Sequence, residues 1–171
     1  MMGKKTYMQL YQLQAKQYVK TDMKTAWEFL SDPKNLQKIT PKEMGFNILA
    51  GADRKMFSGQ IIHYTVSPFP GLTTKWVTEI THVEKGVYFV DEQRYGPYAM
   101  WHHKHFIKEV PGGIEMEDII DYKIPLGILG QIAHPILVKP QLKKIFTHRE
   151  KALGQIFGSL NIPSSLTITK I

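Results

Sequence analysis

Short β-prone stretches separated by turn residues fill the middle of the chain, and this pattern constrains the fold more than any other feature. Each stretch is roughly ten residues long and rich in β-branched and aromatic residues, as strands are. We expect strands over Gln60–Val66, Thr73–Val83, Val87–Tyr95, Ala99–Val110 and Ile114–Ile124. The links between them are short and rich in Gly and Pro, whereas a parallel pair needs a long crossover. The sequence therefore predicts an antiparallel meander of about five or six strands.

Before the meander, the sequence predicts one strand and two short helices. The strand is expected over Tyr7–Val19, where apolar and polar residues alternate imperfectly. Thr21 or Asp22 then supplies an N-cap for a short helix with an apolar stripe. A second helical turn is expected over Pro33–Ile39, because proline suits the first position of a helix.

The last third of the chain is predicted to form a long helix. Its apolar residues recur at helical spacing: Leu142, Ile145, Phe146, Leu153, Ile156 and Phe157. Pro135 and Pro140 interrupt the upstream part, so we expect a kink or a broken entry there. The tail, residues 161–171, has no amphipathic period and is expected to fray.

Length and composition predict one domain, over residues 1–160, followed by the tail. The chain has 171 residues, of which 43% are hydrophobic, enough for a buried core. The absence of Cys excludes disulfides, thiolate metal sites and a cysteine nucleophile. No apolar run is long enough for a membrane span, and the N-terminal segment does not read as a signal peptide. We therefore expect a cytoplasmic protein.

Strand alternation predicts which side chains point inward. In Ala99–Val110, Trp101, His103, His105 and Ile107 share one face, which carries no permanent charge. The aromatic-rich faces of the neighbouring strands also carry polar groups, namely Asp91, Gln93 and Asp118. A buried carboxylate is costly unless it is paired or hydrogen-bonded, so this convergence requires an explanation.

These residues form a pattern that extends over several strands and into the last helix. The pattern is Phe89-x-Asp91-x-Gln93-x-x-Gly96-Pro97-x-x-x-Trp101-x-His103-x-His105, then Met116-x-Asp118-x-Ile120-x-Tyr122-x-x-Pro125-x-Gly127, then Gln141-Leu142-x-x-Ile145-Phe146-x-x-Arg149. It resembles the ligand-binding SRPBCC domains, START-related and Bet v 1-like proteins, in their polyketide cyclase/dehydrase-type group.

The resemblance implies an α+β helix-grip fold. In this fold a curved seven-stranded antiparallel sheet wraps around a long C-terminal helix, and two short helices follow the first strand. Between the sheet and the helix the resemblance implies a deep cavity for an apolar or amphipathic ligand. It does not imply one activity, because members range from lipid carriers to cyclases.

Two kinds of chemistry compete for the inward-facing histidines. His103 and His105, with Asp91 or Asp118 across the sheet, have the composition of a two-His-one-carboxylate metal site. We favour mutual hydrogen bonding in a partly wet cavity, because His-x-His on a strand is a weak signal and the family is not metal-dependent. No metal or cofactor is therefore expected.

The same groups are candidates for acid–base catalysis. His103 or His105 would transfer a proton, with Asp118 fixing the tautomer, as in an enzyme of cyclase, aromatase or hydratase type. We favour non-catalytic ligand binding, because polar groups in a cavity also provide binding specificity. An interaction or chaperone-regulating module is a third alternative; a deep cavity argues against it and a filled core argues for it.

Arg149 lies on the apolar stripe of the last helix. It would either pair with an inward Asp or an acidic ligand group, or extend its charged end into water. We expect an internal ion pair.

The positive net charge raises the question of an acidic partner at the surface. The charge is +7, and the last helix carries much of it on Lys139, Lys143, Lys144 and Lys151. The aromatic residues are not interleaved with Lys and Arg as in a nucleic-acid-binding surface, so no nucleic acid is expected. A solvated face is the ordinary interpretation of such a helix, and weak contact with an anionic surface is the alternative.

The sequence as a whole predicts a domain that binds a small hydrophobic or amphipathic molecule, with no oligomeric state specified. Two proline-containing turns, Ser67–Gly71 and Tyr95–Tyr98, are either cavity lips or ordinary hairpins. The predicted ligand-binding residues are Tyr64, Trp76, Phe89, Asp91, Gln93, Trp101, His103, His105, Asp118, Tyr122 and Arg149.

Overall fold

A computed structural model describes residues 9–69 and 71–171 of the chain. The strands are β1 (Tyr11–Val19), β2 (Asn47–Ala50), β3 (Gln60–Phe69), β4 (Leu72–Glu84), β5 (Tyr88–Tyr95), β6 (Met100–Val110), β7 (Gly113–Lys123) and β8 (Ser165–Lys170). The helices are α1 (Met23–Leu30), the 3-10 helices η1 (Pro33–Ile39) and η2 (Lys42–Met44), α2 (Gly127–Ala133), the π-helical turn η3 (His134–Val138) and α3 (Lys139–Phe157).

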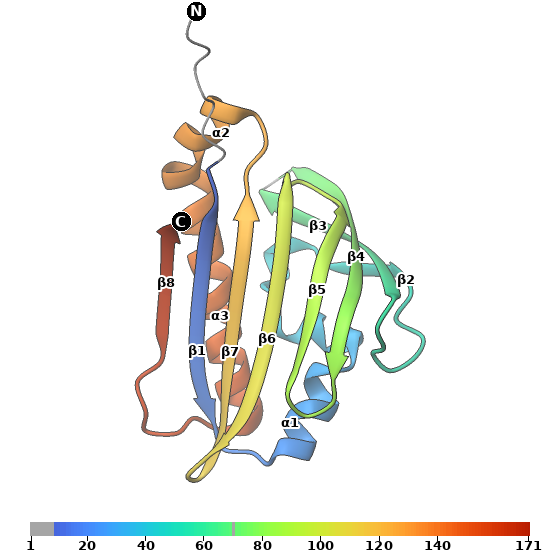
Figure 1. Cartoon of the computed structure of the whole chain (residues 1–171), viewed down its shortest axis with the longest axis vertical. Helices are drawn as coiled ribbons and strands as arrows, with labels where there is room; N and C mark the ends of the chain where they lie inside the picture. The colour runs from blue at the N-terminus through green and yellow to red at the C-terminus, as the bar shows by residue number, and fades with distance from the viewer. Residues whose placement is uncertain (1–8, 70) are drawn as a thin grey trace, which may run out of the picture.

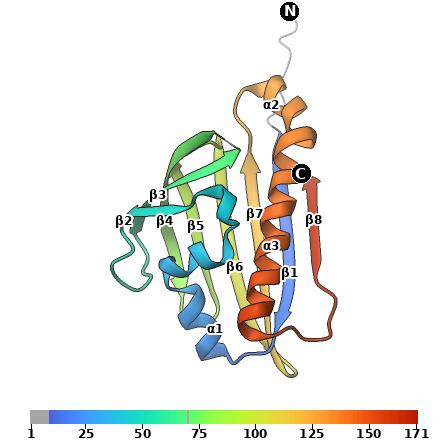
Figure 2. The same cartoon turned by 180° about the vertical axis from the view of Figure 1, so that it is seen from behind.

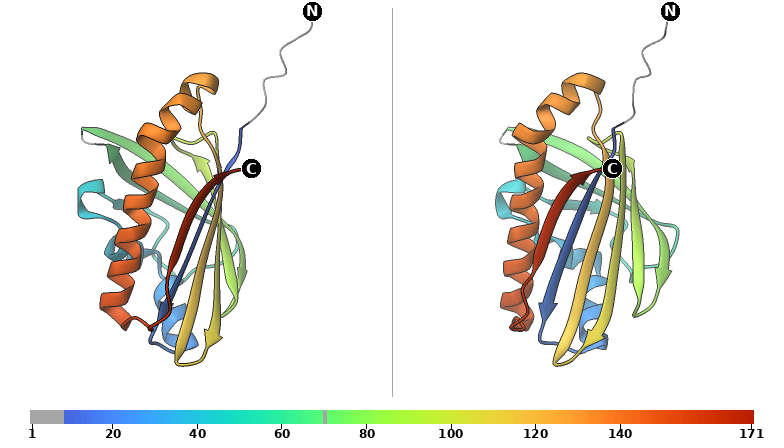
Figure 3. Two further views of the ribbon diagram at one scale, coloured as in Figure 1. Left: turned by 90° about the vertical axis from the view of Figure 1, so that its left-hand side faces the viewer. Right: turned by 60° about the vertical axis from the view of Figure 1, so that its left-hand side comes forward.

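All eight strands form one antiparallel sheet in the order β2-β3-β4-β5-β6-β7-β1-β8 (Figure 1). The sheet curves, and α3 lies against its concave face, as the helix-grip prediction requires (Figure 3). Seen from behind, α1 and the 3-10 helices cover the part of that face that α3 leaves open (Figure 2). The predicted α+β fold class is thus confirmed.

The sheet has one strand more than expected. The tail was predicted to fray, but Ser165–Lys170 forms β8 and pairs antiparallel with β1, from Tyr11 opposite Lys170 to Lys16 opposite Ser165. The prediction of a fraying tail is therefore wrong. The segment Ser165-Leu166-Thr167-Ile168-Thr169-Lys170 does alternate as a strand, and its inward residue Ile168 is 8% exposed.

The predicted N-terminal elements are confirmed from Tyr11 onward. Tyr7, the predicted start of the first strand, lies outside the described residues. Asp22 is the N-cap of α1, because its carboxylate accepts a hydrogen bond from the Thr25 backbone N–H at 2.9 Å. Asp32 caps η1 in the same way, through the Lys34 N–H at 3.0 Å.

The predicted break before the last helix is present as η3. Pro135 has no backbone N–H to donate and lies in this π-helical turn, between α2 and α3. Among the described residues, no helix combines the length and the apolarity that crossing a bilayer requires.

A closed apolar core fills the end of the sheet–helix interface near the C-terminus of α3. This closed core includes Val19, Ala26, Trp27, Ile107, Ile114, Met116, Ala152 and Leu153, and it continues to Ile39 and Phe89. Leu153 and Ile114 are each 1% exposed. Toward the N-terminus of α3, Leu142 and Phe146 pack with Leu13, Ile120 and Tyr122 in a second buried cluster, and both also line a cavity.

Candidate ligand-binding site

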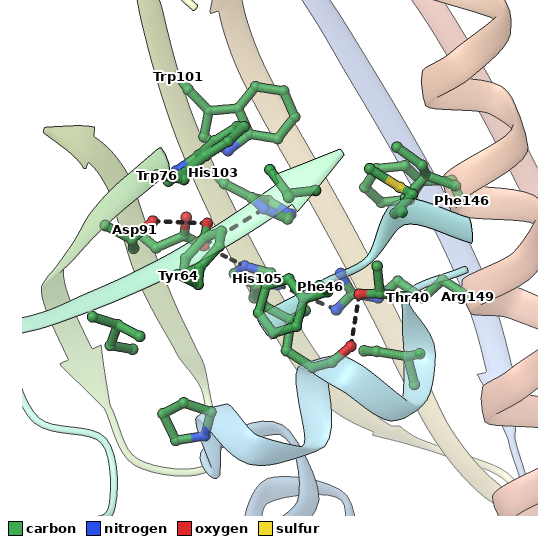
Figure 4. A pocket seen from close by; sticks show the side chains of 18 of the residues that line it. Thr40, Phe46, Tyr64, Trp76, Asp91, Trp101, His103, His105, Phe146 and Arg149 are labelled. Atoms are coloured by element: carbon green, nitrogen blue, oxygen red, sulfur yellow. Dashed lines mark hydrogen bonds and ion pairs between the residues drawn. The ribbon is translucent and has the colours of Figure 1, made fainter. Parts of the chain in front are cut away.

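A cavity of about 340 Å³ lies between the sheet, η1, η2 and α3 (Figure 4). Its walls are mostly apolar and aromatic, and one wall carries charged side chains. Eight of the eleven predicted ligand-binding residues line it, namely Tyr64, Trp76, Phe89, Asp91, Trp101, His103, His105 and Arg149. The alternation of β5 and β6 places Phe89, Asp91, Trp101, His103 and His105 on the concave face, as predicted.

Three predicted residues do not line the cavity. Gln93 instead holds the β5–β6 turn, because its side chain donates to the Tyr98 carbonyl at 2.7 Å and accepts from the Tyr98 N–H at 3.1 Å. Asp118 lies behind the histidines and is 6% exposed. Tyr122 is fully buried and hydrogen-bonds through its hydroxyl to His134 Nε2 at 2.7 Å.

Strand register brings the charged residues together. Asp91 is paired with His103 across β5 and β6, and Asp118 is paired with His105 across β6 and β7. Each histidine is 7% exposed. Because the four side chains share the concave face, they form one contiguous cluster, with Asp91 and Arg149 on opposite sides of His105 (Figure 4).

Asp118 contacts both histidines through one carboxylate oxygen. Its Oδ1 lies 3.0 Å from His103 Nε2 and 2.8 Å from His105 Nδ1. A carboxylate only accepts hydrogen bonds, so His103 Nε2 donates to Asp118, while His105 Nδ1 also lies 3.5 Å from the donor Arg149 Nη2. His105 Nε2 also lies 2.8 Å from Asp91 Oδ2, and therefore it carries a proton too. The two carboxylates beside His105 favour the protonated form of its ring.

His103 differs from His105 in its second nitrogen. His103 Nδ1 is 3.5 Å from Asp91 Oδ2, beyond a good hydrogen bond. Burial and the charge of His105 together lower the pKa of His103 to about 4, although Asp91 and Asp118 act in the opposite sense. The ring is therefore neutral near pH 7, and with its proton on Nε2 the Nδ1 lone pair is available. For His105, burial also lowers the pKa, but the hydrogen bonds to Asp118 and Asp91 outweigh it and raise the pKa overall.

Arg149 completes the cluster from α3. Its Nη2 lies 3.4 Å from Asp118 Oδ1, and the residue is 8% exposed. The expected internal ion pair is present, and the alternative of a side chain extended into water is wrong. Burial alone would raise the pKa of Asp118, but Arg149, His103 and His105 hold it well below the usual range. Burial is likewise outweighed at Asp91, whose pKa is lowered.

Positive groups compensate the two carboxylates of the cluster. Asp91 and Asp118 face the Arg149 guanidinium and His105, whose protonated form they favour, while the pKa of His103 is lowered to about 4. This balance is the physical condition under which several charges are tolerated at low exposure. The side chains of the cluster are hydrogen-bonded to one another in this arrangement.

The same geometry contains potential metal ligands. One donor atom each from Asp91, His103 and His105 lie within 4.8 Å of one another. A metal here would have to replace the proton on His105 Nε2 and would add positive charge to a balanced site beside Arg149. The metal alternative is therefore chemically defined and is open to direct measurement.

Aromatic side chains form much of the cavity wall. Trp76 packs against Tyr64 at 5.9 Å and, edge-on, against Trp101 at 5.4 Å between ring centroids. Trp76 is 9% exposed, so it is a wall residue rather than a platform for stacking bases. Burial raises the pKa of Tyr64, whose hydroxyl contacts Thr78 Oγ1 at 3.1 Å.

Both proline-containing turns contribute to the cavity, as the lip interpretation requires. Pro68 comes from the first, and Pro97 and Tyr98 come from the second. Sequence reasoning missed the wall residues from η1, η2, β2 and the approach to it: Leu36, Ile39, Thr40, Met44, Phe46 and Ile48. Leu36 and Ile39 are three residues apart on one face of η1, which was the available signal.

The basic face of α3 is smaller than the sequence indicates. Arg149 points inward, and Lys144 Nζ lies 2.7 Å from Glu43 Oε1. Lys143 and Lys151 remain exposed on this helix, and Lys139 is half-buried.

Comparison with known proteins supports the fold through structure alone, since no family model and no curated protein matches the sequence. A protein of Chromobacterium violaceum has a TM-score of 0.66 at 10% identity, covering 87% of this chain and 99% of that chain. A START superfamily protein from Mycobacterium smegmatis gives 0.62 at 15% identity, with 85% and 99% covered. A Thermus thermophilus protein gives 0.63 at 11% identity, with 85% and 98% covered. The chain therefore has the helix-grip fold of START-like proteins.

Proposed function

We propose that this protein binds a small hydrophobic or amphipathic molecule in the cavity between the sheet and α3. The observation that carries the proposal is an apolar and aromatic cavity whose wall contains one cluster of charged, hydrogen-bonding side chains. Ligand sites commonly combine such walls with a few polar groups that fix orientation. A volume of about 340 Å³ suits one compact ligand.

The cluster defines how a ligand would be oriented. When His103 Nε2 donates to Asp118, the Nδ1 atom of the neutral ring carries a lone pair, so it accepts a hydrogen bond from a ligand hydroxyl or N–H group. The apolar body of the ligand then lies against Trp76, Trp101 and Phe46. A molecule with one polar end and a compact apolar body would hydrogen-bond to the cluster and pack against the aromatic wall.

Native mass spectrometry of protein purified from its own host tests this proposal. The wild type is expected to retain a small molecule. Val66→Phe fills the cavity from β3 and should abolish the extra mass, whereas the matched control Val87→Phe, on an exposed turn outside the cavity, should keep it. Equal retention by the two variants would show that the molecule binds elsewhere, and no retained mass in the wild type would count against the proposal.

A second candidate is acid–base catalysis, of cyclase, aromatase or hydratase type. The observation in its favour is that two adjacent histidines have pKa values moved in opposite directions, His103 down to about 4 and His105 up. His103 would accept a proton from a bound substrate, and Asp118 would hold its tautomer. His103→Asn should then retain the ligand but lose turnover; unchanged turnover would exclude this role.

The metal alternative has its own measurement. Elemental analysis of dialysed protein, before and after one equivalent of zinc, iron or manganese, should find no stoichiometric metal if the His105 proton occupies the site. A stoichiometric metal that is lost in Asp91→Asn would replace the hydrogen-bonded arrangement with metal coordination.

A further inference from the structure

The segment from Leu126 to Leu137, formed by α2 and η3, exposes six large apolar side chains. They are Leu126, Ile128, Leu129, Ile132, Ile136 and Leu137, with exposed fractions from 49% to 76%. We call this group the apolar ridge. Isolated exposed apolar residues are ordinary, but a contiguous group of this size marks an interaction surface.

An ordinary surface helix buries its apolar face, whereas this segment exposes its apolar side chains to solvent. Its inward face carries Gly130 and His134, four residues apart, and both are buried. A Cβ at Gly130 would overlap the Pro125 carbonyl oxygen, so the helix sits against the body of the protein through backbone. His134 stacks on Tyr11 at 3.6 Å between centroids and bonds to the Tyr122 hydroxyl.

The turn into α2 adopts an unfavourable backbone conformation at Leu126. Leu126 has φ +68°, and within the described residues it is the one non-glycine residue with positive φ. That conformation is unfavourable for a branched apolar side chain, and it leaves Leu126 76% exposed. Contacts of Gly130 and His134 with the rest of the protein therefore fix this segment with its apolar side chains facing outward.

Basic residues flank the ridge, and acidic residues are absent from the surrounding sequence. Residues 122–149 contain no Asp or Glu. Lys123 precedes the ridge, while Lys139 and Lys143 follow it on the first turns of α3, four residues apart on one side of the helix. Apolar side chains followed by Lys on the next helix match an anionic lipid surface, which offers acyl chains and negative headgroups together.

The ridge also borders the cavity. Ile124 and Pro125 line the cavity immediately before the ridge in sequence, and Val138 and Gln141 line it immediately after. The helix α2, which bears Ile128, Leu129 and Ile132 of the ridge, lies at the end of the molecule where β7 ends (Figures 1 and 2). A surface seated on the ridge would therefore meet the protein beside the cavity wall.

We propose that the apolar ridge docks this protein on an anionic phospholipid bilayer, with Ile132 and Ile136 entering the acyl-chain boundary and Lys139 and Lys143 contacting the headgroups. The proposal goes beyond ligand binding, since docking requires no occupied cavity. It also supplies a route by which an apolar ligand avoids water on entering the cavity.

Vesicle flotation tests the docking. Wild-type protein should float with vesicles of phosphatidylcholine and phosphatidylglycerol, and much less with phosphatidylcholine alone, and salt near 0.5 M should reduce the bound fraction. Ile132→Ser with Ile136→Ser should weaken partitioning at least about tenfold. The matched control, Ile61→Ser with Val87→Ser, changes two exposed apolar residues outside the ridge and should bind as the wild type does.

The charge requirement is tested separately. Lys139→Gln with Lys143→Gln should lower affinity for the anionic vesicles by about tenfold or more, and leave weak binding to neutral vesicles unchanged. Equal loss in the ridge and control variants, or no binding by the wild type, would overturn the proposal. So would a stable dimer in analytical ultracentrifugation that the ridge variant dissociates, because the occupant would then be a second copy.

One further measurement separates this proposal from the proposed ligand binding. The ridge variant should keep any small molecule detected by native mass spectrometry, because its substitutions are exposed and outside the cavity wall. Retained ligand without vesicle binding in the wild type would refute docking alone. Vesicle binding without any retained ligand would support docking and count against ligand binding.

Discussion

The two ends of the sheet–helix interface are built differently, although one helix spans both. Leu153 and Leu142 lie on the inward side of α3 and are 1% and 2% exposed. Leu153 belongs to the closed core, whereas Leu142 packs in the second buried cluster on one side and lines the cavity on another. The two leucines are therefore equally buried but not equally packed, because a side chain beside a void has neighbours on fewer sides.

Charge follows the same division. The closed core is wholly apolar, while the cluster of Asp91, His103, His105, Asp118 and Arg149 stands at the hollow end. Stability at the closed end depends on packing, and at the end that holds the cavity it depends also on charges that compensate one another. Charge-removing substitutions and pH should therefore affect the end with the cluster, and truncation of apolar side chains should affect the closed core more. Three experiments test this contrast.

The largest effect is expected from Asp118→Asn. This change removes the carboxylate that pairs with Arg149 and leaves a buried guanidinium without compensation, so the free energy of unfolding should fall by about 4 kcal/mol. Urea denaturation measures it. The double variant Asp118→Asn with Arg149→Gln should lose less than the sum of the single changes, because the two charges leave together. Strict additivity would contradict an energetically coupled pair.

A pH effect of about 3 kcal/mol is expected from His103. Its folded pKa, about 4, lies below the unfolded value of 6.5, so protons favour the unfolded chain. This contribution is therefore fully present above pH 6.5 and is lost as the pH falls from 6.5 toward 4, by about 3 kcal/mol. His105 acts in the opposite sense, because its raised pKa favours protonation of the folded chain.

Comparing His103→Asn with the wild type isolates the His103 contribution. The difference in unfolding free energy between the two proteins should change by that amount between pH 7 and pH 4. Leu153→Ala serves as the control from the closed core and should follow the wild-type pH dependence. Parallel curves for His103→Asn and the wild type would contradict a neutral, buried His103.

The smallest effect is the difference between the two leucines. Leu153→Ala should cost about 3 kcal/mol, and Leu142→Ala about 2 kcal/mol, because the cavity already deprives Leu142 of some contacts. Thermal and urea unfolding of both variants measures the difference of about 1 kcal/mol. A larger loss for Leu142 would mean that the cavity wall is as tightly packed as the closed core.

Alternation along the strands was sufficient to predict most of the site. Trp101, His103 and His105 share a face whatever the tertiary structure, because successive side chains of a strand point to opposite sides. The helical spacing of Arg149 from Leu142 and Phe146 likewise placed it inward. The fold itself rested on the order of elements together with the resemblance, and the structural comparisons agree with it.

The errors arose where local pattern does not specify the partner. Asp118 and Tyr122 were placed on the correct face, but whether a residue meets a void or another side chain depends on the opposite wall. Periodicity also does not say which face of α2 is buried, and there the small residue Gly130 decides it. The strand-like alternation of residues 165–170 has no strong flanking signal, so its pairing with β1 was missed.

The pairing of β8 with β1 determines which strand forms this edge of the sheet. Removing residues 161–171 would expose the nine-residue strand β1 as a free edge, with unpaired N–H and C=O groups beside the buried side chains Tyr11 and Leu13. Long exposed edges template pairing between chains. The six-residue β8 replaces that edge with a shorter one that ends in Lys170, and so acts as a guard against edge-to-edge aggregation.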